Sequence, residues 1–217
     1  MIRLRAVFEK TGRAKYISHL DLNRCMLRVF RRSKLPIWYT EGFNPHPYFS
    51  FALALSLGFE SRCEILDFNL NEEMPFDTVR DRLNAVMPEG MSILSVAEQK
   101  KKITEIAWAE YEIILSSEAP ERVFADIEAL IGQDEIIVEK KTKKGMKDID
   151  IKPFVGITGF GGSDGLISFG MRLPAGTQTN LNPSLFLDAL KKTSDTPFET
   201  ENICRTAIMC ENYEIFS

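Results

Sequence analysis

Apolar and polar residues alternate in several short segments of the chain and follow a helical period in others. In the first half, the strand-like segments are residues 2–8, 48–57, 64–70 and 91–97. One helical stretch begins after Ser18 and ends before Pro36. A second begins at Pro75 and is ended by Pro88, Glu89 and Gly90. The resulting order of strand, helix, strand, strand, helix, strand is that of the split βαβ, or ferredoxin-like, unit.

The second half of the chain repeats this order with additions, although no residue identity between the halves is evident. Its strand-like segments are residues 108–115, 135–140, 148–155, 166–173 and 203–215, and its helices are residues 120–131 and 182–192. A charged stretch at residues 99–105 separates the halves. We therefore expect an α+β fold of tandem ferredoxin-like (βαββαβ) units, with antiparallel sheets and helices on one face. The predicted units are residues 1–98 and an elaborated unit at residues 107–217.

The first predicted helix has an apolar side and an arginine side. Ser18 followed by Asp21 is an N-terminal capping signal. At 100° per residue, the apolar side holds Leu22, Cys25, Met26, Val29, Phe30 and Ser33, and the opposite side holds Arg24, Arg28, Arg31 and Arg32. The stripe itself contains no interleaved acid, so its like charges repel one another unless an anion lies across them. Arginine suits phosphate, which predicts an RNA-binding face; an ordinary solvated helix face is the alternative.

A loop rich in proline and aromatic residues follows this helix. Its sequence EGFNPHP (41–47) contains one glycine and two prolines, which exclude regular structure and hold an imidazole in a stiff loop. Aromatic rings and an imidazole in such a loop can lie against a base. Helix and loop together predict a nucleic-acid-binding site made of Arg24, Arg28, Arg31, Arg32, Lys34, Phe43, Asn44, His46 and Tyr48.

The distribution of charge favours a localised polyanion site. Residues 1–34 contain ten Lys/Arg and two acids, which gives +8, so the other 183 residues carry −12 of the total of −4. A basic end on an acidic protein can bind a polyanion in one place while the remaining surface repels it.

Composition argues against several other classes of protein. The chain has two histidines and four cysteines without a CxxC pair, so we expect no metal site and no cofactor. No apolar run is long enough to span a bilayer, and the N-terminal segment lacks the apolar core of a secretory signal. The expected protein is cytoplasmic and has no membrane partner.

Two further segments have alternative interpretations. Five glycines between residues 156 and 165 lack the spacing of a phosphate-binding loop and predict a hairpin or bulged turn. A lysine-rich turn could contact nucleic acid or be solvated, and its members are Lys140, Lys141, Lys143, Lys144 and Lys147.

Candidate catalytic groups are few. His19 begins the first helix, where the positive end of the helix dipole favours the neutral imidazole that a general base requires. Tyr16 precedes His19 by three residues in the sequence. The same position equally suits a histidine that only hydrogen-bonds a neighbouring strand, and no serine lies in a nucleophile-elbow context.

The segments YISHLDLNRCMLRVFRRSKLP (16–36) and EGFNPHPYFSFALALSLGFES (41–61) resemble a bacterial family described as radical SAM-linked proteins, a domain of unassigned function. The resemblance covers nearly the whole chain. It implies a partner, a cobalamin-binding-type radical SAM protein fused to or encoded beside the domain, which would carry the cluster. The tandem plan is also similar to that of the CRISPR repeat-processing endoribonucleases, by architecture alone.

These observations favour an RNA-binding accessory protein, with tRNA or ribosomal RNA as its ligand, that works with a radical SAM enzyme in RNA modification. One alternative is a metal-independent endoribonuclease with His19 as base and Tyr16 near the attacking hydroxyl. Another is an adaptor that docks the radical SAM partner without nucleic acid. The sequence does not decide whether the protein is a catalyst, though a binding role is favoured.

Overall fold

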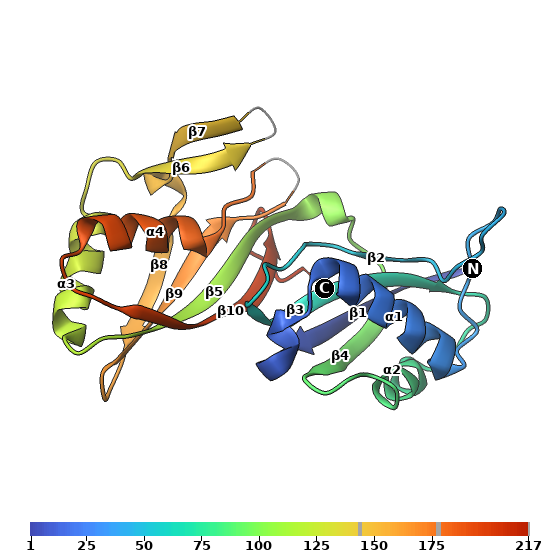
Figure 1. Cartoon of the computed structure of the whole chain (residues 1–217). Coiled ribbons are helices and arrows are strands. Elements are labelled where there is room, and N and C mark those ends of the chain that lie inside the picture. The colour runs from blue at the N-terminus through green and yellow to red at the C-terminus, as the bar shows by residue number, and fades with distance from the viewer. Residues whose placement is uncertain (143–144, 177–178, 217) are drawn as a thin grey trace. The chain divides into compact units, whose positions relative to one another are not determined.

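The computed structural model describes residues 1–142, 145–176 and 179–216 (Figure 1). The chain divides into two compact units. The N-terminal unit comprises Met1–Ile106 together with the last residues from Glu214 onward, and the C-terminal unit comprises Ala107–Tyr213. The predicted α+β class is confirmed, with a mainly antiparallel sheet and, within the described residues, four α-helices. None of these helices is long and apolar enough to cross a membrane.

The N-terminal unit follows the predicted order of elements. Its elements are β1 (Ile2–Lys10), α1 (His19–Ser33), β2 (Phe49–Phe51), β3 (Glu60–Leu70), α2 (Phe76–Asn84) and β4 (Met91–Glu98). Strand β1 lies between β4 and β3, and β2 pairs with β3; all these pairs are antiparallel.

The core of this unit lies between the sheet and its two helices. Alternate residues of β1, including Leu4 and Phe8, point into the core, as a half-buried strand requires. Phe30 of α1 packs against Phe68 of β3, with ring centroids 5.2 Å apart. The predicted apolar side of the first helix is therefore the side that faces the sheet.

Two predicted elements of this unit are shorter than their apolar residues suggested. The strand predicted at 48–57 is only Phe49–Phe51, because its register with β3 covers only these residues; just beyond them, the Ala52 N–H still donates to the Ile65 carbonyl at 3.1 Å. The second helix ends at Asn84. There the Asn84 side-chain amide turns to β4, accepting a hydrogen bond from the Ile93 N–H at 2.7 Å and donating to the Ile93 carbonyl at 2.9 Å.

The C-terminal unit contains the same order of elements with a hairpin inserted. Its elements are β5 (Ile106–Ser116), α3 (Pro120–Ile131), β6 (Ile137–Thr142), β7 (Gly145–Asp150), β8 (Gly156–Gly161), β9 (Leu166–Pro174), α4 (Pro183–Thr193) and β10 (Glu199–Cys210). The strand order is β10-β5-β9-β8, and β6 and β7 form a separate two-stranded sheet. The ferredoxin-like classification of both units stays a prediction.

Several boundaries predicted for this unit differ from the observed ones, and three of the differences are large. The strand predicted at 148–155 stops at Asp150, because Pro153 lies in a short 3-10 turn that follows. The glycine-rich segment forms the β8–β9 hairpin with a register shift between Thr158 and Phe160, so its first half is strand. The last strand, predicted at 203–215, runs from Glu199 to Cys210.

Candidate nucleic-acid interface

Helix α1 is fixed at both ends by local interactions. The Ser18 hydroxyl oxygen accepts a hydrogen bond from the Asp21 N–H at 3.2 Å, and the hydroxyl donates to the Asp21 carboxylate at 2.8 Å. Lys34 adopts the left-handed conformation, with φ of 56°, and ends the helix before Pro36. The predicted cap is therefore confirmed, and it sets where the arginine side chains emerge.

The four arginines of α1 are all solvent-exposed, but they are not equivalent. The Arg24 guanidinium donates a hydrogen bond to Asp21 Oδ1 at 3.1 Å in an exposed ion pair. Asp21 lies one turn before Arg24 on the same side of the helix, so the stripe has no interleaved acid, but its first arginine is paired with the acid of the helix cap. Within the described residues, Arg28, Arg31 and Arg32 form no ion pair with a carboxylate. Three guanidinium groups therefore remain for an external anion.

The Asp21 carboxylate is held in its charged form. Its pKa lies below the ordinary value of 3.8, first because of the hydrogen bond from Ser18 and then because of the hydrogen bond from Arg24. Asp21 is therefore ionised at neutral pH and competes with any external anion for Arg24.

Cys25 lies on the apolar side of α1 and is partly buried. Burial raises the pKa of its thiol, and the positive charge of Arg28 offsets part of this rise. The thiol is therefore protonated at neutral pH and is a poor nucleophile.

The predicted stiff loop is closed into a hairpin. The Tyr48 N–H donates to the Trp38 carbonyl at 3.0 Å, and the Thr40 N–H donates to the His46 carbonyl at 2.9 Å. The rings of Trp38 and Tyr48 meet edge to face with centroids 5.5 Å apart. We call residues 38–48 the aromatic hairpin. It follows α1 in the chain after residues 34–37; Figure 1 shows where α1 lies in the N-terminal unit.

His46 is braced within the aromatic hairpin by its own backbone and by Thr40. Its Nδ1 lies 3.0 Å from the Asn44 carbonyl oxygen and 3.2 Å from the Thr40 hydroxyl. A carbonyl oxygen can only accept, so Nδ1 carries the hydrogen in this arrangement. The ring is exposed, and Nε2 of the neutral imidazole is left as an acceptor toward solvent.

Three aromatic rings of the hairpin are open to solvent. Phe43 at the tip is fully exposed, and Tyr39 and Tyr48 are 40% and 44% exposed. Exposed aromatic rings that gather on one short hairpin form a candidate contact surface for a partner. Tyr39 was absent from the sequence-based site; its position beside the proline-rich loop was the available signal.

The two candidate catalytic residues have different neighbours. His19 is exposed at the start of α1, and its ring meets Phe51 edge to face with centroids 5.5 Å apart. Tyr16 is exposed in the turn before the helix, with the Lys15 ammonium 5.5 Å from its ring centroid. No hydrogen bond or ring contact between His19 and Tyr16 occurs within the ranges that the structure describes. The geometry gives a nuclease mechanism no specific support.

The lysine-rich turn lies in the β6–β7 hairpin of the C-terminal unit. Lys140 is directly opposite Lys147 in the register, and its ammonium donates to the Asn180 carbonyl at 2.6 Å. Lys143 and Lys144 lie outside the described residues. The role of this turn stays a prediction.

The fold and this surface define an α+β protein with a basic helix and an aromatic hairpin on its N-terminal unit. The chain belongs to the family described as "Uncharacterized protein conserved in bacteria (DUF2344)", whose model matches residues 3–183. The expectation of a bacterial family of unassigned function is confirmed.

One solved structure illustrates the fold. It is titled "Crystal Structure of a Cbf5-Nop10-Gar1 Complex" and matches with a TM-score of 0.52 at 10% sequence identity. The match covers 94% of this chain and 48% of that chain, so this protein spans about half the length of its structural neighbour. At this identity the likeness concerns the fold alone. None of the curated proteins matches the chain.

Proposed function

We propose that this protein binds structured RNA, either tRNA or ribosomal RNA, through the arginine face of α1 and the aromatic hairpin. The observation that carries the proposal is the exposed set of Arg28, Arg31 and Arg32, for which the described residues supply no carboxylate partner. Repeating phosphates at fixed spacing suit several guanidinium groups on one helix face. The remaining chain is acidic, which confines a polyanion to this region.

The aromatic hairpin adds recognition of bases to this phosphate-binding face. Phe43 offers a stacking surface at its tip, and Asn44, His46 and Tyr48 supply hydrogen-bonding groups beside it. Phosphate contacts from α1 position the RNA, while the hairpin contacts unpaired bases. Lys34 lies between the two elements and contributes a further positive charge.

The wider role that we propose is that of an accessory protein, which presents its RNA to a radical SAM enzyme for modification. This step rests on the resemblance of the HLD helix and the GFNPHP loop to radical SAM-linked proteins. This accessory role is tested by measuring RNA modification by the radical SAM protein with and without this chain. The double variant Arg28→Gln, Arg31→Gln, which should bind RNA poorly, is the control.

RNA binding is tested by fluorescence anisotropy with labelled tRNA and ribosomal RNA fragments at several salt concentrations. Replacing Arg28 and Arg31 by Gln together should make the plot of log affinity against log salt shallower by about 2, about one unit for each lost phosphate contact. The matched control replaces two exposed basic residues of the C-terminal unit, Arg122→Gln with Lys192→Gln, and should leave the slope unchanged.

Each other outcome selects a different function. Equal losses in both double variants would show nonspecific attraction and contradict the proposed site. Discrete RNA products that disappear in His19→Ala would support the endoribonuclease alternative. Absence of RNA binding together with co-purification of a radical SAM protein would support the adaptor.

A further inference from the structure

The turn before α1 presents an exposed tyrosine from a firmly held backbone. Tyr16 ends a short 3-10 turn, Gly12–Tyr16, and its side chain is 68% exposed. The carbonyl of Lys15, the residue before it, accepts hydrogen bonds from the Gly58 N–H at 2.9 Å and from the ammonium group of Lys10 at 3.2 Å. Lys10 is itself only 1% exposed, so this anchor lies inside the N-terminal unit. The main chain therefore holds the Tyr16 ring out at the surface.

Two exposed leucines lie at the same end of α1. Leu57 is 63% exposed and precedes Gly58, whose hydrogen bond to Lys15 brings the two segments side by side. Leu20 is 60% exposed and lies in the first turn of α1. Large exposed apolar side chains that gather in one place form a candidate contact surface. We call Tyr16, Leu20 and Leu57 the tyrosine patch.

The tyrosine patch continues the arginine face of α1. At 100° per residue, Leu20 lies within about 40° of Arg24 and of Arg31 around the helix axis. The segment 10–34 contains eight Lys/Arg and one acid. A phosphate chain that follows the arginines toward the start of the helix therefore stays within a positively charged region as it reaches the patch.

The tyrosine patch and the aromatic hairpin lie at opposite ends of β3. The hydrogen bond between Lys15 and Gly58 lies just before β3 begins at Glu60. At the other end of the strand, the Trp38 N–H of the hairpin donates to the Asn69 carbonyl at 2.9 Å. Strand β3 has 11 residues, which span about 35 Å. One RNA that reaches both places therefore needs two separate unpaired regions.

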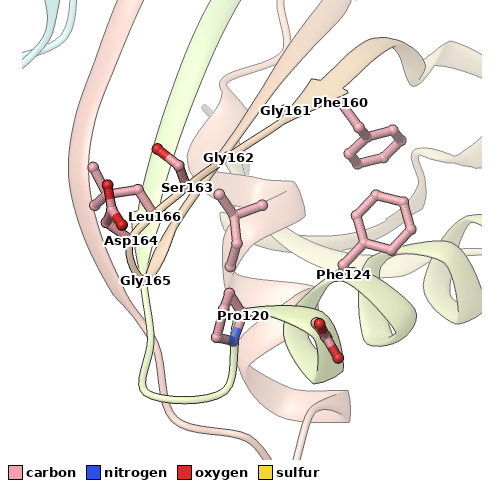
Figure 2. A pocket seen from close by; sticks show the side chains of 11 residues that line it. Pro120, Phe124, Phe160, Gly161, Gly162, Ser163, Asp164, Gly165 and Leu166 are labelled. Atoms are coloured by element: carbon pink, nitrogen blue, oxygen red, sulfur yellow. The ribbon is translucent and has the colours of Figure 1, made fainter.

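An exposed aromatic pair in the C-terminal unit lacks this basic setting. Phe160 is 40% exposed and meets Phe124 edge to face, with centroids 4.7 Å apart, in a pocket between the start of α3 and the β8–β9 hairpin (Figure 2). None of the described residues that line this pocket is Lys or Arg, and Glu121 among them is acidic. A phosphate group is not attracted there, so Phe160 provides a control for an exposed ring without cations.

We propose that the tyrosine patch is a second base-stacking site, which takes an unpaired nucleotide beyond the RNA segment bound by the arginines. The base stacks on the Tyr16 ring and contacts Leu20 and Leu57. The Lys15 ammonium, 5.5 Å from the centroid of that ring, pairs with the adjoining phosphate. This inference rests on the proposed RNA binding and narrows its ligand to a paired segment with unpaired nucleotides on both sides. Tyr16 acts here through its ring and not through its hydroxyl.

The test compares three RNA hairpins that share one loop and one stem. One ends blunt, and the other two carry a short single-stranded tail at the 5′ or the 3′ end. The affinity of the full chain for each RNA is measured by fluorescence anisotropy at one salt concentration. The wild-type protein should bind one of the tailed RNAs at least about fivefold more tightly than the blunt RNA, the lower end of the range for one base stacked on an aromatic ring.

Three variants separate stacking from other effects. Tyr16→Ala should bind the tailed RNA no more tightly than the blunt one, whereas Tyr16→Phe keeps the ring and should keep the preference. Tyr16→Ala should still bind the blunt RNA with wild-type affinity, which excludes misfolding. The control Phe160→Ala should leave the preference unchanged. With 2-aminopurine in the tail, fluorescence should change on binding to wild type and Tyr16→Phe but not on binding to Tyr16→Ala.

The remaining outcomes overturn the proposal. If the wild-type protein binds the three RNAs equally, or if Tyr16→Ala retains the preference, the tyrosine patch is not a base-stacking site, while RNA binding by the arginine face stands. If Tyr16→Phe loses the preference as Tyr16→Ala does, the hydroxyl is required and the stacking role is wrong. If none of the three RNAs binds, the proposed function fails and this inference fails with it.

Discussion

Arg5 of β1 and Asp67 of β3 lie directly opposite each other in the sheet and form a buried ion pair, with Nε to Oδ1 at 2.7 Å and Nη2 to Oδ2 at 2.9 Å. Gln99 donates to Asp67 at 2.9 Å, and the Lys101 carbonyl accepts from Arg5 at 3.0 Å. The Arg5 guanidinium lies 4.2 Å from the centroid of the Phe216 ring. Through these contacts the pair links Gln99 and Lys101, which follow β4, and Phe216, near the C-terminus, to the sheet.

Removing one member of this pair should strongly destabilise the protein. Asp67→Ala leaves a buried guanidinium without its carboxylate, so the free energy of unfolding should fall by about 3–5 kcal/mol. Asp77→Ala removes an exposed partner of Arg80 on α2 and should lower the free energy of unfolding far less than Asp67→Ala does. Urea denaturation measures both values, and equal losses would show that the buried pair has no special role.

The pKa of Asp21 should respond most to Ser18. Because the Ser18 hydrogen bond is the largest cause of the lowered pKa, Ser18→Ala should raise it toward 3.8 by more than Arg24→Gln does. A lowered pKa in the folded state means that ionised Asp21 stabilises the fold above pH 3.8 and that this stabilisation is lost as the pH falls through the folded-state pKa. NMR titration of the Asp21 carboxyl carbon measures the shift, and the reverse ranking of the two variants would contradict it.

Asp21 should also weaken RNA binding, because it occupies Arg24. Asp21→Asn removes this competition, and the affinity for RNA should rise by about two- to fivefold, the range expected for an exposed ion pair. The control is Asp77→Asn, which removes an equal charge from α2, outside the proposed RNA site. Anisotropy titrations at one salt concentration compare the two. An equal rise in both variants would reflect net charge only.

Phe43 should discriminate looped RNA from duplex RNA. Its ring is fully exposed, so Phe43→Ala should leave stability unchanged while removing one stacking contact, a loss of about 1–3 kcal/mol in binding to an RNA with unpaired bases. Binding to a fully paired duplex should not change. Phe154→Ala, a partly exposed phenylalanine of the C-terminal unit, is the control. If Phe43→Ala binds each of the two RNAs with the same affinity as the wild type, the hairpin does not belong to the proposed site.

Features of the candidate site that depend on neighbours in sequence were predictable. The start of α1 at Ser18, its end before Pro36 and the common side of its arginines follow from capping, proline geometry and helical period. The Asp21–Arg24 ion pair could also have been predicted from the sequence, because residues three apart lie on the same face of a helix. It was missed because Asp21 was counted only as part of the cap.

The sequence by itself therefore determined the α+β class, the order of elements in the N-terminal unit and the two faces of α1. Only the tertiary structure decided that β2 stops at Phe51, that Arg5 meets Asp67, and that α3 and the β8–β9 turn enclose a pocket. The physical reason is range: periodicity and capping act over a few residues, whereas strand pairing, burial of a charge and the walls of a cavity depend on residues far away in the chain.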